Sequence, residues 1–291
     1  MTRRRNQKLN EEQIVDLEAW RPVMETMVSK WHLPISKVRK ANRNFETWLV
    51  FADTHIPHQN KPTINVLLKL CEDINPDGLA ILGDFMDLSC ISHWNKSKPA
   101  RVEGKRLIED YAEGNAILDE FDRRLAKNTK KIFLYGNHER FYNDMTEEFP
   151  VLTGLGEPSV CLKLAERGFK IYAKQNEIVK LGKLSMCHGM YTGDTAVKKH
   201  VQAFMTNVLF GHVHSQAEFC APSPAKDISI YGASLGCTCD MNPDYLQNSP
   251  HKWTHGFAVV YVYDREYFDV DLKRVINGKV IFNDKLYDGN R

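Results

Sequence analysis

Short apolar runs alternate with amphipathic stretches along the first half of the chain. The runs at residues 48–51, 78–82 and 131–135 have the length and composition of buried β-strands. Between them, apolar side chains recur at helical spacing over residues 61–74 and 102–127. This order is typical of a parallel sheet that is covered by helices.

The pattern changes to mostly strands after residue 170. Strands are predicted at 170–173, 178–181, 184–187, 208–210, 228–231 and 257–263, with one helix at 194–204 and further strand pairs within 268–287. Residues 162–168 are predicted to end a helix at Gly168. An α/β half followed by a mainly β half favours two packed sheets with helices outside.

The first 45 residues show charge and helical periodicity but no strand pattern. Residues 1–43 contain ten Lys and Arg against five Asp and Glu, a net charge of about +5, whereas the whole chain carries +2. We predict a basic helical N-terminal extension at 1–45 and one α/β domain at 46–291, with a helical insertion at 88–130. The extension is either a phosphate-seeking arm, a solvated helical segment or a helix-turn-helix.

Composition indicates a soluble globular protein, with 43% hydrophobic and 26% charged residues. The seven cysteines form no Cys-x-x-Cys pair, so neither a zinc ribbon nor a disulfide framework is predicted, and Cys237 and Cys239 are given no role. The N-terminus has no apolar signal segment, and no run approaches the roughly 18 apolar residues of a membrane span. We therefore expect a cytoplasmic protein in a reducing compartment.

Residues that bind metal ions follow five of the predicted strands. The segments are Asp53-Thr54-His55, Gly83-Asp84-Phe85-Met86-Asp87, Gly136-Asn137-His138-Glu139, His188-Gly189 and Gly211-His212-Val213-His214. Each segment by itself is more typical of a turn or a polar loop. Because ligand sites in open α/β folds lie at the carboxyl ends of strands, the joint pattern indicates one shared site.

In their order, these segments resemble the motifs of the calcineurin-like metallophosphoesterase superfamily, which are D-x-H, G-D-x-x-D, G-N-H-[DE], H and G-H-x-H. All five motifs are present within residues 46–265, and the layout is similar to small bacterial and phage-type members. The resemblance implies a four-layer α/β/β/α sandwich of two mixed β-sheets, with a dinuclear metal site at the strand C-terminal ends. It also implies a metal-dependent phosphoric ester hydrolase.

The resemblance assigns a ligand set to each of two divalent metal ions. One ion would be held by Asp53, His55, Asp84 and His214, and the other by Asp84, Asn137, His188 and His212. Such mixed ligands suit Mn²⁺ best, with Fe, Zn²⁺ or Ni²⁺ as alternatives. A hydroxide bridging the ions would attack the phosphorus in line, and the site would keep a net charge of about +1 for an anionic phosphate.

The resemblance implies that His138 is not a ligand but acts at the leaving-group oxygen, as a general acid or by stabilising the transition state. Asp87 would orient His138 and raise its pKa, unless it is simply an acid at the start of a helix. Arg140 is a candidate phosphate contact or part of a structural ion pair. His93 and Trp94 lie in a loop with several basic residues, and this favours stacking against a substrate.

The remaining histidines are given no catalytic role. His58 is expected to be a loop histidine, and His200 is expected on a solvated helix face beside Lys198 and Lys199. His251 and His255 flank Trp253, where they either line the site or belong to a loop.

Three functions are compatible with the motifs. A phosphodiesterase or nuclease acting on DNA or RNA is favoured, and a phosphomonoesterase or nucleotide hydrolase acting on a small phosphorylated substrate is the alternative. A non-catalytic scaffold is disfavoured because no ligand position is substituted. Leu88 stands where the serine/threonine protein phosphatase branch has Arg, which argues against that branch, and Glu139 stands where the DNA-repair nuclease branch has Asp. No membrane partner is expected.

Overall fold

The computed structural model describes residue 27 and residues 44–174, 176–223, 228–243, 246 and 250–291. The predicted N-terminal helices and the proposed helix-turn-helix lie outside these residues. Within the described part, none of the helices combines the length and the apolar character that a membrane crossing requires.

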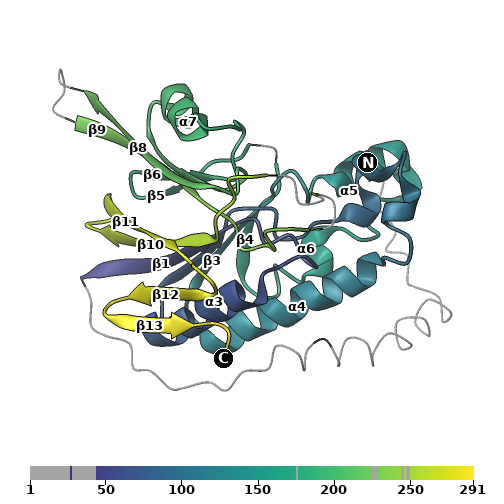
Figure 1. Ribbon diagram of the computed structural model, residues 1–291, viewed down its shortest axis with the longest axis horizontal. Helices are drawn as coiled ribbons and strands as arrows, with labels where there is room; N and C mark the ends of the chain where they lie inside the picture. The colour runs from purple at the N-terminus through teal and green to yellow at the C-terminus, as the bar shows by residue number, and fades with distance from the viewer. Residues whose placement is uncertain (1–26, 28–43, 175, 224–227, 244–245, 247–249) are drawn as a thin grey trace, which may run out of the picture.

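Two mixed β-sheets form the centre of the fold (Figure 1). The first contains β1 (Phe45–Phe51), β2 (Gly78–Ile81), β3 (Lys130–Leu134), β4 (Phe169–Tyr172), β10 (Gly256–Tyr263) and β11 (Tyr267–Arg274). The second contains β5 (Val179–Leu181), β6 (Leu184–Cys187), β7 (Asn207–Phe210), β8 (Gln216–Ser223) and β9 (Ile228–Leu235). Their strand orders are β11-β10-β1-β2-β3-β4 and β5-β6-β7-β9-β8, and a separate hairpin joins β12 (Lys279–Phe282) to β13 (Lys285–Asp288).

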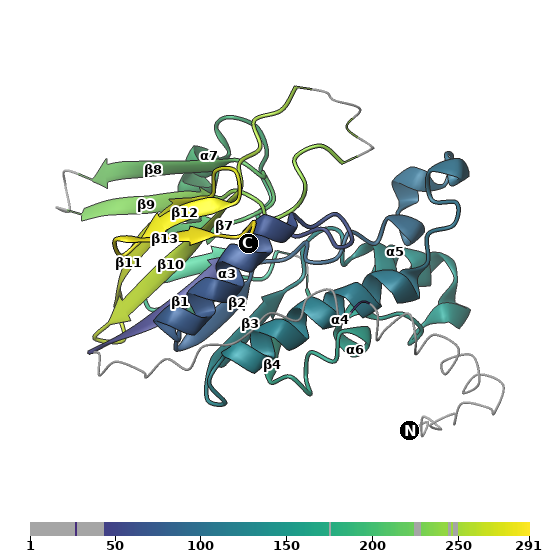
Figure 2. The same cartoon turned by 60° about the horizontal axis from the view of Figure 1, so that its bottom comes forward.

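Helices cover the outer faces of both sheets (Figures 1 and 2). The helices are α3 (Lys61–Ile74), α4 (Leu107–Arg124), α5 (Phe141–Glu148), α6 (Pro158–Cys161) and α7 (Ala196–Phe204). Short 3-10 turns occur at Ser89–Ile91, His93–Asn95, Pro99–Arg101 and Pro150–Leu152. Helices α3 and α4 lie against the first sheet and α7 against the second, which gives four layers.

Alternation along β1 shows how the layers are held together. Leu49 and Phe51 pack with the apolar faces of α3 and α4, whereas Trp48 and Val50 point into the core between the two sheets. A third cluster packs Val201 of α7 on the outer face of β7. The predicted sandwich of two mixed sheets between helices is therefore confirmed.

Local chemistry accounts for the limits of α3, which agree with the predicted range. Asn60 caps its first turn by accepting a hydrogen bond from the Thr63 amide at 3.0 Å, and Pro62 stands where no intrahelical donor is needed. The helix ends at Asn75, which adopts a left-handed conformation with φ of 40°.

Two predicted elements differ from the structure, and one strand was missed. Helix α4 begins at Leu107, not at residue 102, because Pro99–Arg101 forms a 3-10 turn before it. The helix predicted to end at Gly168 is wrong, since α6 ends at Cys161 and Lys163 turns into a left-handed conformation with φ of 54°. Strand β8 was missed because it lies at the edge of its sheet and lacks an apolar run.

The sheet topology brings the five motifs to one place. Strands β1, β2 and β3 are parallel neighbours, and β6 and β7 are parallel neighbours in the second sheet. Their carboxyl ends therefore lie along the same edge of each sheet, and each of these five strands is followed by one of the motifs.

Candidate metal centre

The loops after β1, β2, β3, β6 and β7 gather the seven predicted ligand side chains. Five of the seven adopt left-handed backbone conformations, with φ between 49° and 68°: Asp53, His55, Asp84, His212 and His214. Such conformations are costly for residues other than glycine and cluster at functional sites, where the surroundings enforce them. The backbone is therefore shaped to direct these side chains, at a cost that packing elsewhere must offset.

Glycines allow the loops to approach one another closely. A side chain at Gly136 would place its Cβ atom 2.1 Å from Oδ1 of Asp84. A side chain at Gly211 would place its Cβ atom 2.4 Å from Oδ2 of Asp53. Gly136 is thus required for contact between the loops after β2 and β3 of the first sheet, and Gly211 for contact between the loops of the two sheets.

The first group of ligand atoms comes from Asp53, His55 and His214. The Nε2 atoms of the two histidines lie 3.1 Å apart, and Nε2 of His214 lies 3.3 Å from Oδ1 of Asp53. All these ligand atoms fall within 4.8 Å of one another and are buried. Two imidazole nitrogens and a carboxylate that face a common point form a donor set suited to a divalent cation.

The second group is built around His188. Its Nε2 lies 3.0 Å from Oδ1 of Asn137 and 3.2 Å from Oδ2 of Asp84, while its Nδ1 donates to the carbonyl of Leu82 at 2.8 Å. Nδ1 therefore carries the proton, and Nε2 is directed at the site as a metal ligand would be. The His212 ring lies 5.1 Å from the His188 ring, and its ligand nitrogen joins the same group.

Asp84 lies between the two groups. Its Oδ2 is 3.8 Å from Nε2 of His55 and 3.2 Å from Nε2 of His188, and its Oδ1 accepts the His138 amide at 2.8 Å. Asp53 anchors the other side, because both of its carboxylate oxygens accept the His212 amide, at 2.8 and 3.0 Å. Asp84 is thus placed where a ligand shared by two ions would lie.

Charges on the clustered side chains balance one another. Burial opposes protonation of His188, but the Asp84 carboxylate outweighs burial and raises the His188 pKa to about 9. Burial would raise the pKa of Asp84, yet His188 and His138 hold it well below its usual range. Burial and the charge of His188 lower the pKa of His212 to about 4. Protons on histidine here occupy positions that bound cations would take over.

His138 and Asp87 form a pair beside the metal-ligand group. Nδ1 of His138 lies 2.8 Å from the Asp87 carbonyl oxygen and 3.3 Å from its Oδ1, and the His138 ring packs 4.4 Å from that of His55. Burial opposes protonation, but Asp84 and Asp87 raise the His138 pKa to about 10. The alternative that Asp87 begins a helix is wrong, because Leu88 is left-handed and only a 3-10 turn follows.

Glu139 organises the loops from beneath. Its side chain is fully buried and accepts three backbone N–H groups: those of Asp84 and Gly136 at Oε2, at 2.9 and 2.8 Å, and that of Met86 at Oε1, at 2.9 Å. It ties the loop after β2 to the loop after β3. Burial, followed by the charge of Asp84, raises its pKa to about 7.

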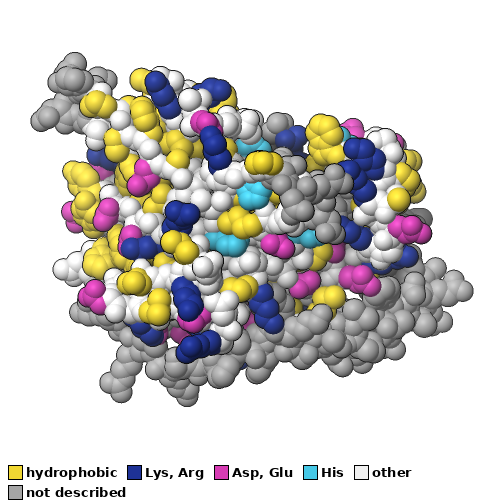
Figure 3. Space-filling model, viewed as in Figure 1, with side chains coloured by type: hydrophobic (Ala, Val, Ile, Leu, Met, Phe, Trp, Pro, Cys, Tyr) yellow, Lys and Arg dark blue, Asp and Glu magenta, His cyan; other side chains and the backbone are white. Residues whose placement is uncertain are grey.

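The candidate substrate contacts lie on one side of the site. Arg140 precedes α5, is half-buried, and forms no ion pair with any residue of the described ranges, so the alternative of a structural ion pair is not supported. His93 packs edge-on against Phe141 at 5.5 Å and lies 4.5 Å from the exposed ring of Trp94. Figure 3 shows histidine side chains at the surface near the middle of one face.

Other histidines differ in their surroundings. The prediction of a solvated His200 is wrong, because His200 is fully buried, stacks on Phe210 at 3.8 Å and accepts the Met190 amide at Nε2. It lies on the face of α7 that covers β7. Its neighbours Lys198 and Lys199 are exposed to solvent, whereas His200 is not. His58 lies 3.9 Å from the Asp87 carboxylate.

Sequence reasoning missed residues that surround His214. Trp253 packs edge-on against its ring at 4.2 Å, and the thiols of Cys237 and Cys239 lie within 4.8 Å of one of its nitrogens. The only feature of the sequence that pointed to these cysteines was their closeness to each other. It did not predict their contact with His214, which lies 25 residues before Cys239.

Comparisons with known proteins found several to which this chain is similar. The Gene 54 protein of Mycobacterium phage L5 is 22% identical over 260 residues, which cover 82% of this chain and 98% of that protein. Similar solved structures include a Vps29 variant from Entamoeba histolytica, with 13% identity, 83% of this chain and 98% of that chain covered, and a TM-score of 0.43. An archaeal phosphodiesterase is 16% identical, with 78% of this chain and 99% of that chain covered and a TM-score of 0.39. The nuclease MPE of Pseudomonas putida is 17% identical, with 77% of this chain and 87% of that chain covered and a TM-score of 0.35.

A family match identifies the chain. Residues 47–216 match the family model described as calcineurin-like phosphoesterase, which is more than half of the sequence. The match includes all five loops that supply the clustered Asp, Asn and His side chains. The chain therefore belongs to the calcineurin-like phosphoesterase family, and it is a metal-dependent phosphoester hydrolase of the dinuclear type.

Proposed function

We propose that the chain is a phosphodiesterase that cleaves nucleic-acid phosphodiesters, and that Mn²⁺ is its preferred metal. In this proposal, the seven clustered side chains hold two ions, with Asp84 shared. One set is Asp53, His55, Asp84 and His214, and the other is Asp84, Asn137, His188 and His212. The donors fit, since neutral imidazoles, one amide and two carboxylates suit borderline divalent metals. When bound, the ions would supply positive charge to the phosphoryl group and lower the pKa of water.

His138 is proposed to act on the leaving-group oxygen. The proposed ligand sets leave it out, although its ring lies close enough to His55 and Asp84 to share a metal ion with them. It is 24% exposed and keeps its Nδ1 against Asp87, which leaves Nε2 for the substrate. The Asp87 carboxylate and carbonyl raise the pKa of His138 and thereby favour a proton on its ring. Asp87 positions the ring, because its carbonyl and carboxylate both lie within 3.3 Å of Nδ1.

A strip of aromatic rings that leads away from His138 is the observation that favours a nucleic-acid substrate. Phe141 lies 4.8 Å from the His138 ring, His93 lies 5.5 Å from Phe141, and Trp94 lies 4.5 Å from His93. Trp94 is 72% exposed, so its ring is open to a stacking partner. Phe141 is buried beneath the strip, so nucleobases next to a cleaved phosphate would stack on the exposed rings of His93 and Trp94. A small monoester does not require such rings.

Basic side chains accompany this strip. Lys96 pairs with Glu148 at the edge of the same loop, and Arg140 lies at the start of α5 beside Phe141. A phosphate backbone running along the strip would meet Arg140 near the catalytic histidine. Arg140 is therefore proposed as a contact to the phosphate next to the cleaved one.

Activity assays with Mn²⁺ test this proposal. The enzyme should hydrolyse bis(p-nitrophenyl) phosphate faster than p-nitrophenyl phosphate, and it should cleave single- or double-stranded DNA or RNA. A preference for the monoester, together with no cleavage of any nucleic acid, would contradict the proposal and favour a phosphomonoesterase.

Replacing Trp94 tests the strip directly. Trp94→Ala should raise KM for an oligonucleotide by about 5- to 150-fold, as expected for a lost stacking contact of about 1–3 kcal/mol, and leave the hydrolysis of bis(p-nitrophenyl) phosphate unchanged. Tyr267→Ala is the matched control. Tyr267 is 48% exposed and pairs with Tyr263, which lies opposite Phe45 at the amino end of β1, on the edge away from the site. If both substitutions changed KM equally, the strip would not be a binding site for nucleobases.

A further inference from the structure

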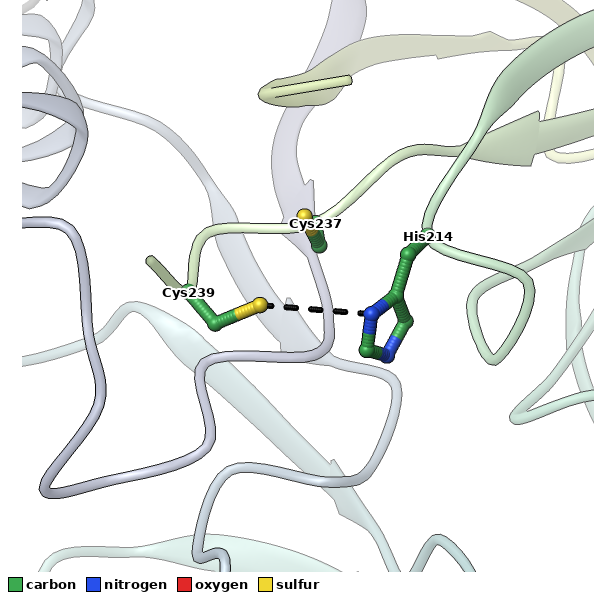
Figure 4. A group of neighbouring side chains, drawn as sticks. All are labelled: His214, Cys237 and Cys239. Carbon is green, nitrogen blue, oxygen red and sulfur yellow. Dashed lines mark hydrogen bonds between the residues drawn. The ribbon is translucent and has the colours of Figure 1, made fainter. Parts of the chain in front are cut away.

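The two cysteines after β9 lie against the outer side of His214. Cys237 and Cys239 are 0% and 1% exposed, and Sγ of Cys239 lies 4.0 Å from Nδ1 of His214. Figure 4 shows the Cys239 thiol and the imidazole pointing toward one another, with Cys237 beside them. Neither thiol belongs to the phosphoesterase ligand sets.

Hydrogen bonds fix the segment that carries these thiols. The Thr238 amide donates to the carbonyl of Asp53 at 3.0 Å, and its hydroxyl lies 2.9 Å from that of Thr54. The Cys237 amide donates to the carbonyl of Thr254 at 2.9 Å. The Cys239 thiol therefore points at His214, with the Cys237 thiol nearby, from a backbone that is held on both sides. Only side-chain adjustment is needed to bring the two sulfur atoms to a common metal ion.

The spacing of the three ligand atoms suits a metal ion. The two sulfur atoms and the histidine nitrogen lie within 4.8 Å of one another. A zinc ion bound by Cys and His has Zn–S and Zn–N distances of about 2.3 and 2.0–2.1 Å, which places such ligands roughly 3.5–4 Å apart. Side-chain movements of less than about 1 Å would complete the set.

We infer that Cys237, Cys239 and Nδ1 of His214 form a separate binding site for a thiophilic divalent ion such as Zn²⁺, and that its occupation weakens the catalytic centre. Two thiolates and an imidazole form a soft donor set, in contrast to the oxygen-rich set on the other side of His214. Binding would release the two thiol protons. The ring would give its lone pair at Nδ1 to the ion and carry its own proton on Nε2.

This shift of the proton links the two sites. Nε2 of His214 faces Asp53 at 3.3 Å and His55 at 3.1 Å, in the first group of ligand atoms. A neutral imidazole has one lone pair, so it cannot serve an ion at Nδ1 and another at Nε2 together. The inhibitory consequence, unlike the binding itself, rests on the proposed role of His214 as a catalytic metal ligand.

Direct spectroscopy tests the site without reference to activity. Metal-free full-length protein is titrated with Co²⁺, which gives an intense near-ultraviolet charge-transfer band when thiolate is bound. We expect this band in the wild type and in Cys220→Ser, whose thiol is exposed and distant on β8. We expect its loss in Cys239→Ser and its weakening in Cys237→Ser. The same band in all four proteins, or none in the wild type, would overturn the inference.

A measurement on the wild type keeps the inference testable if the serine variants do not fold. X-ray absorption of the protein with one equivalent of Zn²⁺ should show sulfur neighbours at about 2.3 Å. A first shell of nitrogen and oxygen alone would overturn the site.

Inhibition by Zn²⁺ tests whether the thiol site weakens the catalytic centre. Zn²⁺ should inhibit the Mn²⁺-supported hydrolysis of bis(p-nitrophenyl) phosphate at least tenfold less potently in Cys239→Ser than in wild type or Cys220→Ser. Equal potency would refute competition at His214. If sulfur-bound zinc is found in a chain that hydrolyses no phosphodiester, the proposed function fails while the thiol site stands.

Discussion

Replacing Glu139 with Gln tests how the protein holds a buried carboxylate beneath its metal centre. An amide oxygen can take over the place of Oε2 and keep the bonds from the Asp84 and Gly136 amides. The amide nitrogen would then face the Met86 amide, which loses the acceptor that Oε1 provides. A buried donor left without a partner costs about 1–3 kcal/mol.

A second effect opposes this loss. Burial and then the Asp84 charge raise the Glu139 pKa from 4.5 to about 7, which corresponds to a cost on the order of 3 kcal/mol for the ionised carboxylate. The neutral amide avoids that cost. Without metal near pH 7, the two effects largely cancel, and we expect the free energy of unfolding of Glu139→Gln to lie within about 2 kcal/mol of wild type.

Bound metal should reveal the difference. Divalent ions at Asp84 would offset the repulsion between the two carboxylates, so the ionised Glu139 becomes favourable and the lost hydrogen bond is no longer compensated. We expect Glu139→Gln to bind metal about 5- to 150-fold more weakly, the equivalent of about 1–3 kcal/mol. The pH dependence has a defined sign. Because the folded pKa lies above the unfolded one, wild-type stability without metal should fall as pH rises from about 4.5 through about 7, and the variant should lack this component.

Two assays decide the matter. Urea unfolding of the metal-free proteins gives the free energy of unfolding, and calorimetric titration with Mn²⁺ gives the affinity. Glu147→Gln, an exposed change on α5, is the control and should stay within about 0.5 kcal/mol of wild type, with unchanged affinity. An unchanged affinity in Glu139→Gln, or a metal-free variant destabilised by more than about 4 kcal/mol, would refute the reasoning.

Three further predictions concern the centre itself. Asp84→Ala removes the carboxylate between the two ligand groups, so bound metal and turnover should both fall by more than about 100-fold, as measured by elemental analysis and hydrolysis of a diester; full activity would contradict the proposed ligand set. His138→Ala should keep both ions and lower kcat by about 10²- to 10⁴-fold, and loss of metal in this variant would argue against its proposed role. Since His188 has a pKa of about 9 without metal and must lose a proton to bind one, the apparent metal affinity should rise by roughly tenfold per pH unit from 7 to 9, and a flat calorimetric profile in that range would contradict it.

Elements with strong local signals could be predicted from the sequence. Helix α3 carries its own cap, proline and C-terminal asparagine, and its limits agree with the prediction. The motif loops follow apolar strands, so their gathering at one edge follows from parallel pairing. The elements that failed depend on tertiary contacts. His200 is buried because α7 packs on β7, and strand β8 is held by pairing with β9.

Contacts around the site were harder to predict than the site itself. The motifs indicate which residues meet, because each motif follows a strand and the parallel strands end at the same edge of a sheet. The residues behind them come from distant segments with no pattern of their own. Glu139 reaches the loop after β2 across 53–55 positions, and the Cys237–Cys239 segment reaches Thr54 across 184. No local periodicity records such neighbours.

These outer contacts differ from one histidine of the centre to the next. The nitrogen of His188 that faces away from the site donates to a backbone carbonyl, and that of His55 faces the Asp87 carboxylate at 3.2 Å. Both partners fix the tautomer that leaves Nε2 free, and a carboxylate partner also strengthens the imidazole as a ligand. His214 has a thiol in that place, 4.0 Å away, which is a weaker partner and a potential metal ligand itself. In the proposed ligand set that His55 and His214 share, His214 should therefore be the more weakly supported imidazole, and its bond to the ion should be the first to be lost when a thiophilic metal competes.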